Sequence, residues 1–251
     1  METVKLFLKE FGSGKPIIFI HGYPLDHTIW LFLVPEMEKH ARLILPDLRG
    51  HGQSPAPVGV YSMELLAADI LALMDELGLE KAVIAGHSVG GYIALRFARE
   101  TPERLAGLAL VASHCFSDPI ERKQNRLDTA EKVERTGKTD FIAETMLPGL
   151  TPDLALQEKL RSIIEKVRPA GVAGILRGMA QRSNTCDVLS KLDVPTVIIA
   201  GELDMFLAIE RAQQMAEMMK KPWLETIPGA GHMPMMEASQ KVSQILRSLL
   251  R

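Results

Sequence analysis

Short apolar runs alternate along this chain with stretches of helical periodicity, and no other feature constrains the fold as strongly. Buried strands are predicted at residues 17–20, 42–45, 81–86, 105–112, 195–200 and 223–227. Amphipathic helices are predicted between them, and one of these begins after Ser62, repeats apolar residues every three or four positions and ends at Gly78. Strands that alternate with helices are typical of a mostly parallel sheet covered by helices, so the predicted fold class is α/β.

The segment 113–186 interrupts this alternation. It contains no convincing strand, and charged residues cluster in it, for example at Glu131-Lys132. Clusters of this kind are usually the solvated faces of helices. We therefore predict an all-helical insertion at residues 113–186, placed within one α/β core made of residues 1–112 and 187–251.

The charge of the chain bears on its partners. The formal net charge is -2, and basic residues are mixed with acidic ones throughout. This distribution favours neither nucleic acid nor an anionic membrane surface as a partner. The longest apolar runs are far shorter than the ~18 residues of a membrane span. We expect a small-molecule substrate and a monomer or small homo-oligomer.

The two cysteines, Cys115 and Cys186, have neither the spacing of metal ligands nor the pattern of a disulfide framework. We therefore predict two free, buried thiols and no metal site. The first fifteen residues carry several charges and lack the apolar core of a signal peptide. A cytoplasmic location is the expectation that follows.

A nucleophile is predicted at Ser88. Gly86-His87-Ser88-Val89-Gly90 has the form Gly-x-Ser-x-Gly, directly after a predicted strand and directly before a helical run. In a nucleophile elbow the serine occupies a sharp, strained turn, and the residues two positions away must be small. The strand and helix on either side make this motif more specific than the five residues alone.

A serine hydroxyl needs a base, and the base needs a carboxylate to orient it. His232 follows the last predicted strand in a glycine-rich loop, which can place an imidazole at the carboxyl edge of the sheet. Asp204 follows the predicted strand at 195–200. The order Ser, Asp, His is the one this kind of fold uses. Glu202 and Asp118 are the competing carboxylates.

An oxyanion hole is predicted from two backbone amides. The N–H of Val89 directly follows the nucleophile, and the N–H of Tyr23 lies in a turn after the first central strand. Such donors stabilise the charge that develops in a tetrahedral intermediate. Gly22 allows close approach of the backbone in that turn.

Five segments together resemble the α/β-hydrolase family. They are residues 21–24, 47–54, 86–91, 201–204 and 231–232. The resemblance covers the predicted core and is strongest to the serine carboxylesterase and lactonase branch. It implies that the insertion is a helical cap over the active site. It also implies structural rather than catalytic roles for His21 and His51.

The resemblance implies hydrolysis of a carboxylic ester or lactone through an acyl-enzyme on Ser88, with no cofactor. Members that hydrolyse epoxides or haloalkanes carry Asp at the elbow, so Ser88 argues against both activities. Three alternatives remain open: a cofactor-free perhydrolase or haloperoxidase, a carbon–carbon bond hydrolase, and a slow-turnover receptor for a small molecule.

Apolar residues near the motifs and in the insertion predict a pocket for an uncharged or weakly charged acyl ester of modest size. Met side chains suit such a pocket, because a thioether fills irregular space. The predicted pocket residues are Leu25, Trp30, Phe116, Met146, Met179, Met205, Phe206 and Met233.

Overall fold

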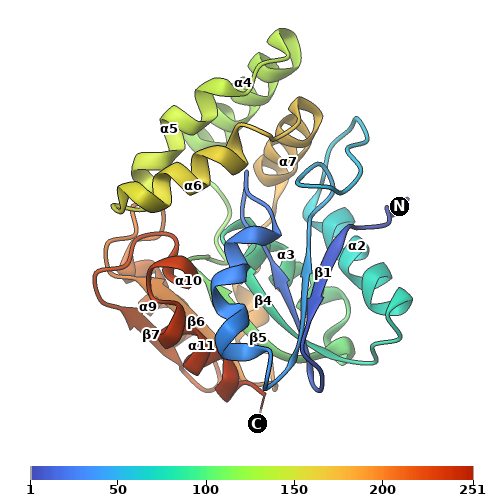
Figure 1. Ribbon diagram of the computed structural model, residues 1–251, viewed down its shortest axis with the longest axis vertical. Helices are drawn as coiled ribbons and strands as arrows, with labels where there is room; N and C mark the ends of the chain where they lie inside the picture. Colours follow the sequence, from blue (N-terminus) through green and yellow to red (C-terminus); the bar gives the residue numbers. More distant parts are fainter. Residues whose placement is uncertain (1, 251) are drawn as a thin grey trace.

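The computed structural model describes residues 2–250 and has one central sheet (Figure 1). The sheet has seven strands in the order β1-β3-β2-β4-β5-β6-β7. Only β1 is antiparallel to its neighbour, and the other strands are parallel. The strands are β1 (Leu8–Phe11), β2 (Pro16–Ile20), β3 (Arg42–Pro46), β4 (Ala82–His87), β5 (Leu105–Val111), β6 (Thr196–Gly201) and β7 (Leu224–Ile227).

Six of these strands match the six predicted ones to within one residue at each end, which confirms the α/β fold class. The central strands β4 and β6 are buried along their whole length, as expected for parallel strands covered on both faces. β1 was not predicted. It is a short edge strand in which Lys9 and Glu10 are exposed and only Leu8 and Phe11 are partly buried.

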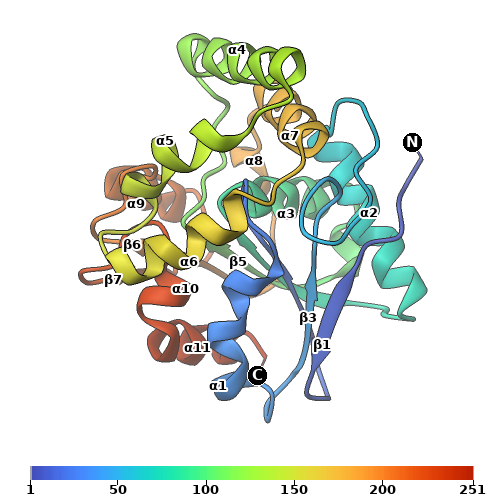
Figure 2. The ribbon, with the colours of Figure 1, turned by 45° about the horizontal axis from the view of Figure 1, so that its top comes forward.

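Helices cover both faces of the sheet (Figures 1 and 2). On one face η1 packs against α10 and α11, and on the other α2 packs against α3. Ser62 caps α2 by accepting a hydrogen bond from the N–H of Leu65, at 3.2 Å. The core helices are η1 (His27–Leu33), α1 (Val34–Met37), α2 (Met63–Glu76), α3 (Val89–Glu100), η2 (Pro102–Arg104), α8 (Cys186–Leu189), α9 (Ile209–Glu217), α10 (Pro234–Glu237) and α11 (Ser239–Ser248).

A helical insert lies between β5 and α8, as predicted. Its helices are α4 (Ile120–Thr136), α5 (Asp140–Leu150), α6 (Leu154–Ile164) and α7 (Pro169–Gln181). They form a separate group at the top of Figure 1, beyond the carboxyl ends of the parallel strands. We propose that this cap extends from residue 113 to residue 186, with residues 1–112 and 187–251 as the core.

The prediction of two free thiols is wrong. Cys115 and Cys186 form a disulfide across 71 positions of sequence, and Thr185 donates its N–H to the carbonyl of Cys115 at 2.9 Å. The bond joins the two ends of the cap, which return to neighbouring places in the fold. Because cytosolic reductants keep most thiols reduced, the disulfide counts against the predicted cytoplasmic location.

Among residues 2–250 no helix has both the length and the apolar character to cross a membrane.

Candidate active site

The candidate nucleophile, Ser88, lies in the turn between β4 and α3. Its φ of 51° is rare for a residue with a side chain and marks a strained backbone. A Cβ at Gly86 would meet the carbonyl oxygen of Gly90 at 2.3 Å, and a Cβ at Gly90 would meet that of Ile20 at 2.3 Å. The turn can therefore close only with glycine at both positions, which is the physical origin of the Gly-x-Ser-x-Gly pattern.

The turn is held in place by hydrogen bonds to the neighbouring strand. Ser88 donates its N–H to the carbonyl of Val111 at 3.0 Å. The hydroxyl of Ser113 donates to the carbonyl of Ser88 at 2.6 Å. Both partners come from the end of β5 and the residues after it, so the sheet itself fixes the position of the serine.

His232 and Asp204 are directly hydrogen-bonded. The Nδ1 atom of His232 lies 2.9 Å from Oδ1 and 2.8 Å from Oδ2 of Asp204. The carboxylate is fully buried and also accepts the N–H groups of Phe206 and Leu207 at 2.8 and 3.0 Å. With Nδ1 donating to this carboxylate, the neutral imidazole has Nε2 as its proton acceptor.

The backbone of His232 is held on both sides. Its N–H donates to the carbonyl of Leu150 at the end of α5, at 2.9 Å. Its carbonyl accepts a hydrogen bond from Nε2 of His87 at 2.8 Å, and burial lowers the pKa of His87 well below its usual value. The carboxylate of Glu237 accepts from the N–H of Gly231 at 2.9 Å and from the hydroxyl of Thr151 at 2.5 Å. The histidine loop is thus anchored to the cap as well as to the core.

The two competing carboxylates are engaged elsewhere. Glu202 accepts the N–H of Gly229 at 2.9 Å. Asp118 is buried against arginines, with Arg126 at 2.7 Å and Arg182 at 2.5 Å. Neither contacts the imidazole of His232, which leaves Asp204 as its carboxylate partner.

The two amides expected to form the oxyanion hole belong to elements next to Ser88. Val89 is the first residue of α3, so its N–H has no acceptor within the helix. Tyr23 shares a cavity with Ser88. The turn that carries Tyr23 is fixed by His21, whose Nε2 accepts the N–H of Leu48 at 2.9 Å while Nδ1 donates to the carbonyl of Gly22 at 2.9 Å. His21 is therefore a structural residue.

A cavity of about 160 Å³ brings the nucleophile and the base together under the cap. Ser88 and His232 both line it. The other residues around it are Tyr23, Tyr92, Ala112, His114, Arg122, Arg126, Met146, Met179, Phe206 and Leu207. An apolar cavity of about 150 Å³ accommodates benzene, so this space suits a small acyl group.

Three of the predicted pocket residues, Met146, Met179 and Phe206, line this cavity. The other five do not, because proximity to a motif in sequence does not fix the direction of a side chain. Trp30 and Met233 are buried in the core, Leu25 is buried beside another pocket, Phe116 stacks beside His114, and Met205 is 75 % exposed.

The sequence reasoning missed Arg122 and Arg126, which line the cavity from α4. Arg122 belongs to the charge cluster Glu121-Arg122-Lys123, and such clusters predict solvated helix faces; Arg126 lies just beyond it. Their spacing of four places them on one side of the helix. Together with Asp118, which lies four residues before Arg122, that spacing was the available signal for an inward-facing cluster.

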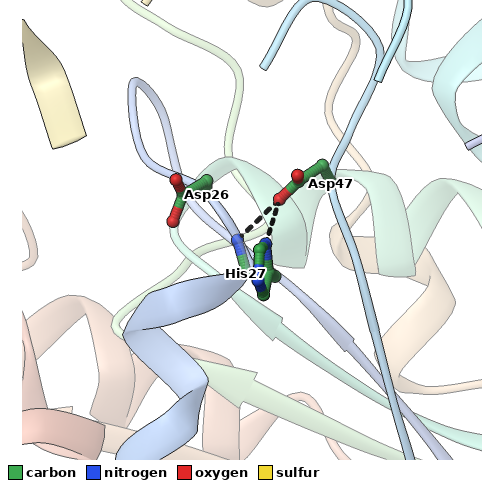
Figure 3. Close-up of side chains that lie close together, drawn as sticks. All are labelled: Asp26, His27 and Asp47. Carbon is green, nitrogen blue, oxygen red and sulfur yellow. Dashed lines mark hydrogen bonds and ion pairs between the residues drawn. The ribbon is translucent and has the colours of Figure 1, made fainter. Parts of the chain in front are cut away.

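One group of side chains among the described residues has the composition of a metal site. Ligand atoms of Asp26, His27 and Asp47 lie within 4.8 Å of one another. Asp47 accepts from the N–H and from Nδ1 of His27 at 2.9 and 2.7 Å (Figure 3). It also accepts from the N–H of Gln53 at 2.8 Å. Asp26 caps η1 by accepting from the N–H of Thr28 at 2.9 Å. Because these oxygens are already bound by N–H groups, we interpret the cluster as a structural anchor for the loop that carries Tyr23.

The chain as a whole is similar to several known proteins. A thermophilic esterase from Thermogutta terrifontis, solved with malate bound, is similar in structure, with a TM-score of 0.95 and 39% identity over 99% of this chain and 93% of that one. A non-heme haloperoxidase from Rhodococcus erythropolis is 30% identical over 92% of this chain and 90% of its own length. The acetyltransferase component of an acetoin cleaving system from Pseudomonas putida is also 30% identical, over 95% of this chain but 64% of that protein.

The family described as alpha/beta hydrolase fold matches residues 15–239. That span includes the elbow, the carboxylate after β6 and the histidine after β7. The chain belongs to the α/β-hydrolase family.

Proposed function

We propose that this protein is a serine esterase that hydrolyses a short carboxylic ester or a lactone. The observation that carries the proposal is the shared cavity of Ser88 and His232, with the imidazole hydrogen-bonded to the buried carboxylate of Asp204. The similarity to the Thermogutta terrifontis esterase supports the same activity.

The proposed reaction has two halves. Ser88 Oγ attacks the ester carbonyl while Nε2 of His232 takes its proton, and Asp204 stabilises the imidazolium. The tetrahedral oxyanion is held by the N–H groups of Tyr23 and Val89. Its collapse expels the alcohol, which takes the proton from His232. Water then attacks the acyl-enzyme with His232 as base, and this releases the acid and restores Ser88.

The test is hydrolysis of 4-nitrophenyl esters from acetate to decanoate. We expect turnover that is highest for short acyl chains, because the cavity is small. Ser88→Ala should lower kcat by about 10⁴-fold or more. Ser190→Ala, an exposed serine on the same chain, is the matched control and should leave turnover unchanged. A Ser88→Ala protein that keeps most of the activity would contradict the proposal.

A cofactor-free perhydrolase is the second candidate, favoured by the similarity to the Rhodococcus erythropolis haloperoxidase. In that reaction hydrogen peroxide replaces water in the second half, so that acetate and peroxide give peracetate and water, and the peracid then oxidises bromide. Peroxide-dependent bromination in acetate buffer that disappears in Ser88→Ala would support it. Ester hydrolysis without any bromination would refute the perhydrolase and support the esterase.

A further inference from the structure

The active-site cavity has two chemically different walls. Met146, Met179, Phe206 and Leu207 are apolar, whereas Arg122 and Arg126 reach the cavity from α4. Among the described residues that line the cavity none is acidic. Two guanidinium groups in a small cavity with no lining carboxylate are not needed to bind a purely apolar acyl chain.

The region behind this wall carries excess positive charge. Asp118 pairs with Arg126 and Arg182, and Nε of Arg122 lies 3.9 Å from its Oδ1. Three guanidinium groups thus face one carboxylate, a surplus of two positive charges. Burial alone would raise the pKa of Asp118, but the hydrogen bond from Arg182 and the charge of Arg126 lower it to about 2, so the carboxylate is already ionised.

A further titratable neighbour of these arginines, His114, adds no compensating charge. Burial and the nearby Arg182 and Arg122 lower the pKa of His114 to about 3, so the ring is neutral at pH 7. It shares a hydrogen bond of 3.1 Å with the hydroxyl of Tyr92, and its Nδ1 is buried without a partner among the described residues.

The two arginines that line the cavity also have donors to spare. Arg126 contributes Nε to Asp118 at 2.7 Å, and its terminal Nη groups make no hydrogen bond to any residue in 2–250. The Arg122 side chain makes no hydrogen bond within that range, because its Nε lies too far from Asp118. The Arg126 side chain is only 13 % exposed, so solvent is largely excluded from it. A planar fork of donors in this setting matches a carboxylate.

We propose that Arg122 and Arg126 bind a free carboxylate of the substrate. The substrate is then a short ester or lactone that also carries a carboxylate group, such as the half-ester of a dicarboxylic acid. This rests on the proposed function, because Ser88 cleaves the ester while the bound carboxylate takes no part in bond making. It replaces the expectation of an uncharged ester drawn from the sequence.

The test compares two esters of equal chain length, the 4-nitrophenyl half-ester of glutaric acid and 4-nitrophenyl pentanoate. The wild-type protein should prefer the charged ester in kcat/KM. Arg122→Gln and Arg126→Gln should each lower the ratio of charged to neutral kcat/KM by about 10- to 100-fold, the effect of losing a charge-assisted hydrogen bond. Arg135→Gln changes the same charge on an exposed face of the same helix and should leave the ratio as it is.

Arg126→Gln also removes a partner of Asp118, so thermal unfolding checks that this variant is folded. Arg122→Gln removes no hydrogen bond to Asp118 and carries the test by itself. A second pair, 3-acetoxybenzoate and phenyl acetate, places the carboxylate on the alcohol side. A ratio unchanged in both arginine variants, with both ester pairs, would overturn the proposal.

Calorimetry separates this proposal from the serine hydrolase mechanism. Glutarate should bind to the Ser88→Ala protein and bind at least tenfold more weakly once Arg122→Gln is added. Arginine-dependent binding without any ester hydrolysis by the wild type would uphold the carboxylate site and refute the esterase. Ester hydrolysis in which neither the rate nor glutarate binding depends on the arginines would uphold the esterase and refute the carboxylate site.

Discussion

The core and the cap contribute to the candidate active site in different ways. In the core, Ser88, Asp204 and His232 each lie in a turn directly after a parallel strand, and backbone hydrogen bonds fix each turn. In the cap, Arg122 and Arg126 project from the N-terminal half of α4, and their surroundings are other side chains. The proposed reacting groups are therefore positioned by the backbone of the core, whereas the proposed binding groups are positioned by side-chain packing in the cap.

Changes in the core and changes in the cap are therefore expected to affect different properties, the turnover rate and the choice of substrate. A change in a core turn moves a reacting atom, so it is expected to lower turnover with every substrate. A change on the cap alters the wall of the cavity, so it is expected to alter the choice of substrate. Stability should also differ between the two regions, since one disulfide joins the two ends of the cap.

Removing that disulfide should have the largest effect on stability. Cys115→Ser with Cys186→Ser opens a loop of 71 positions, and we expect the free energy of unfolding to fall by about 2–4 kcal/mol, because the unfolded chain gains entropy. Urea denaturation measures this. Dithiothreitol should reproduce the loss in the wild type and have no effect on the double variant. An unchanged urea midpoint in protein shown by mass spectrometry to be reduced would contradict the expectation.

The core anchor formed by His27 and Asp47 should show a smaller effect that depends on pH. Burial alone lowers the pKa of His27, but the hydrogen bond and charge of Asp47 raise it overall. Burial alone raises the pKa of Asp47, but the hydrogen bond from His27 and the nearby His21 lower it overall. The pair therefore stabilises the fold most between the ordinary values of 3.8 for Asp47 and 6.5 for His27.

His27→Gln should accordingly cost about 2 kcal/mol of unfolding free energy near pH 5. The His27 contribution is complete below pH 6.5 and is lost as the pH rises through the raised value in the folded state. The difference between wild type and variant should therefore shrink toward pH 9, and urea denaturation at several pH values measures it. A difference that grows with pH would refute the assignment.

Two adjacent residues at the boundary between core and cap should give the smallest change in activity and differ clearly from each other in that change. Phe206 lines the cavity with its ring centroid 4.9 Å from that of His232, whereas Met205 is 75 % exposed. Phe206→Ala should lower kcat/KM for 4-nitrophenyl pentanoate by about tenfold, as lost apolar contact implies. Met205→Ala should change it by less than about twofold. Equal losses in both variants would show that the exposed position of Met205 does not hold during turnover.

The sheet was predictable because its signals are local. A buried parallel strand appears as a short apolar run, and the turn at Ser88 requires small residues at Gly86 and Gly90 wherever it occurs. The edge strand β1 escaped because two of its four residues are charged and exposed. Its four residues form neither a continuous apolar run nor an alternation of apolar and charged residues.

What escaped prediction depends on residues that are distant in sequence. Cys115 and Cys186 approach each other only once the cap has folded back on itself. The direction of Arg126 depends on Asp118, which is buried by the packing of the cap. The spacing of four between Arg122 and Arg126 indicates a shared side of the helix but not the direction in which that side faces, and the same charges would be expected on an ordinary solvated helix.

The hydrogen bond from the N–H of His232 to the carbonyl of Leu150 has a consequence for exchanging parts between relatives. The cap cannot be exchanged independently of the core, because the backbone N–H of His232, the candidate base, is hydrogen-bonded to it. A chimaera that carries a foreign cap must supply a carbonyl at the place of Leu150 and a hydroxyl at the place of Thr151. A chimaera whose junction falls within residues 150–153 would lose these hydrogen bonds, whereas one that retains those residues would keep them.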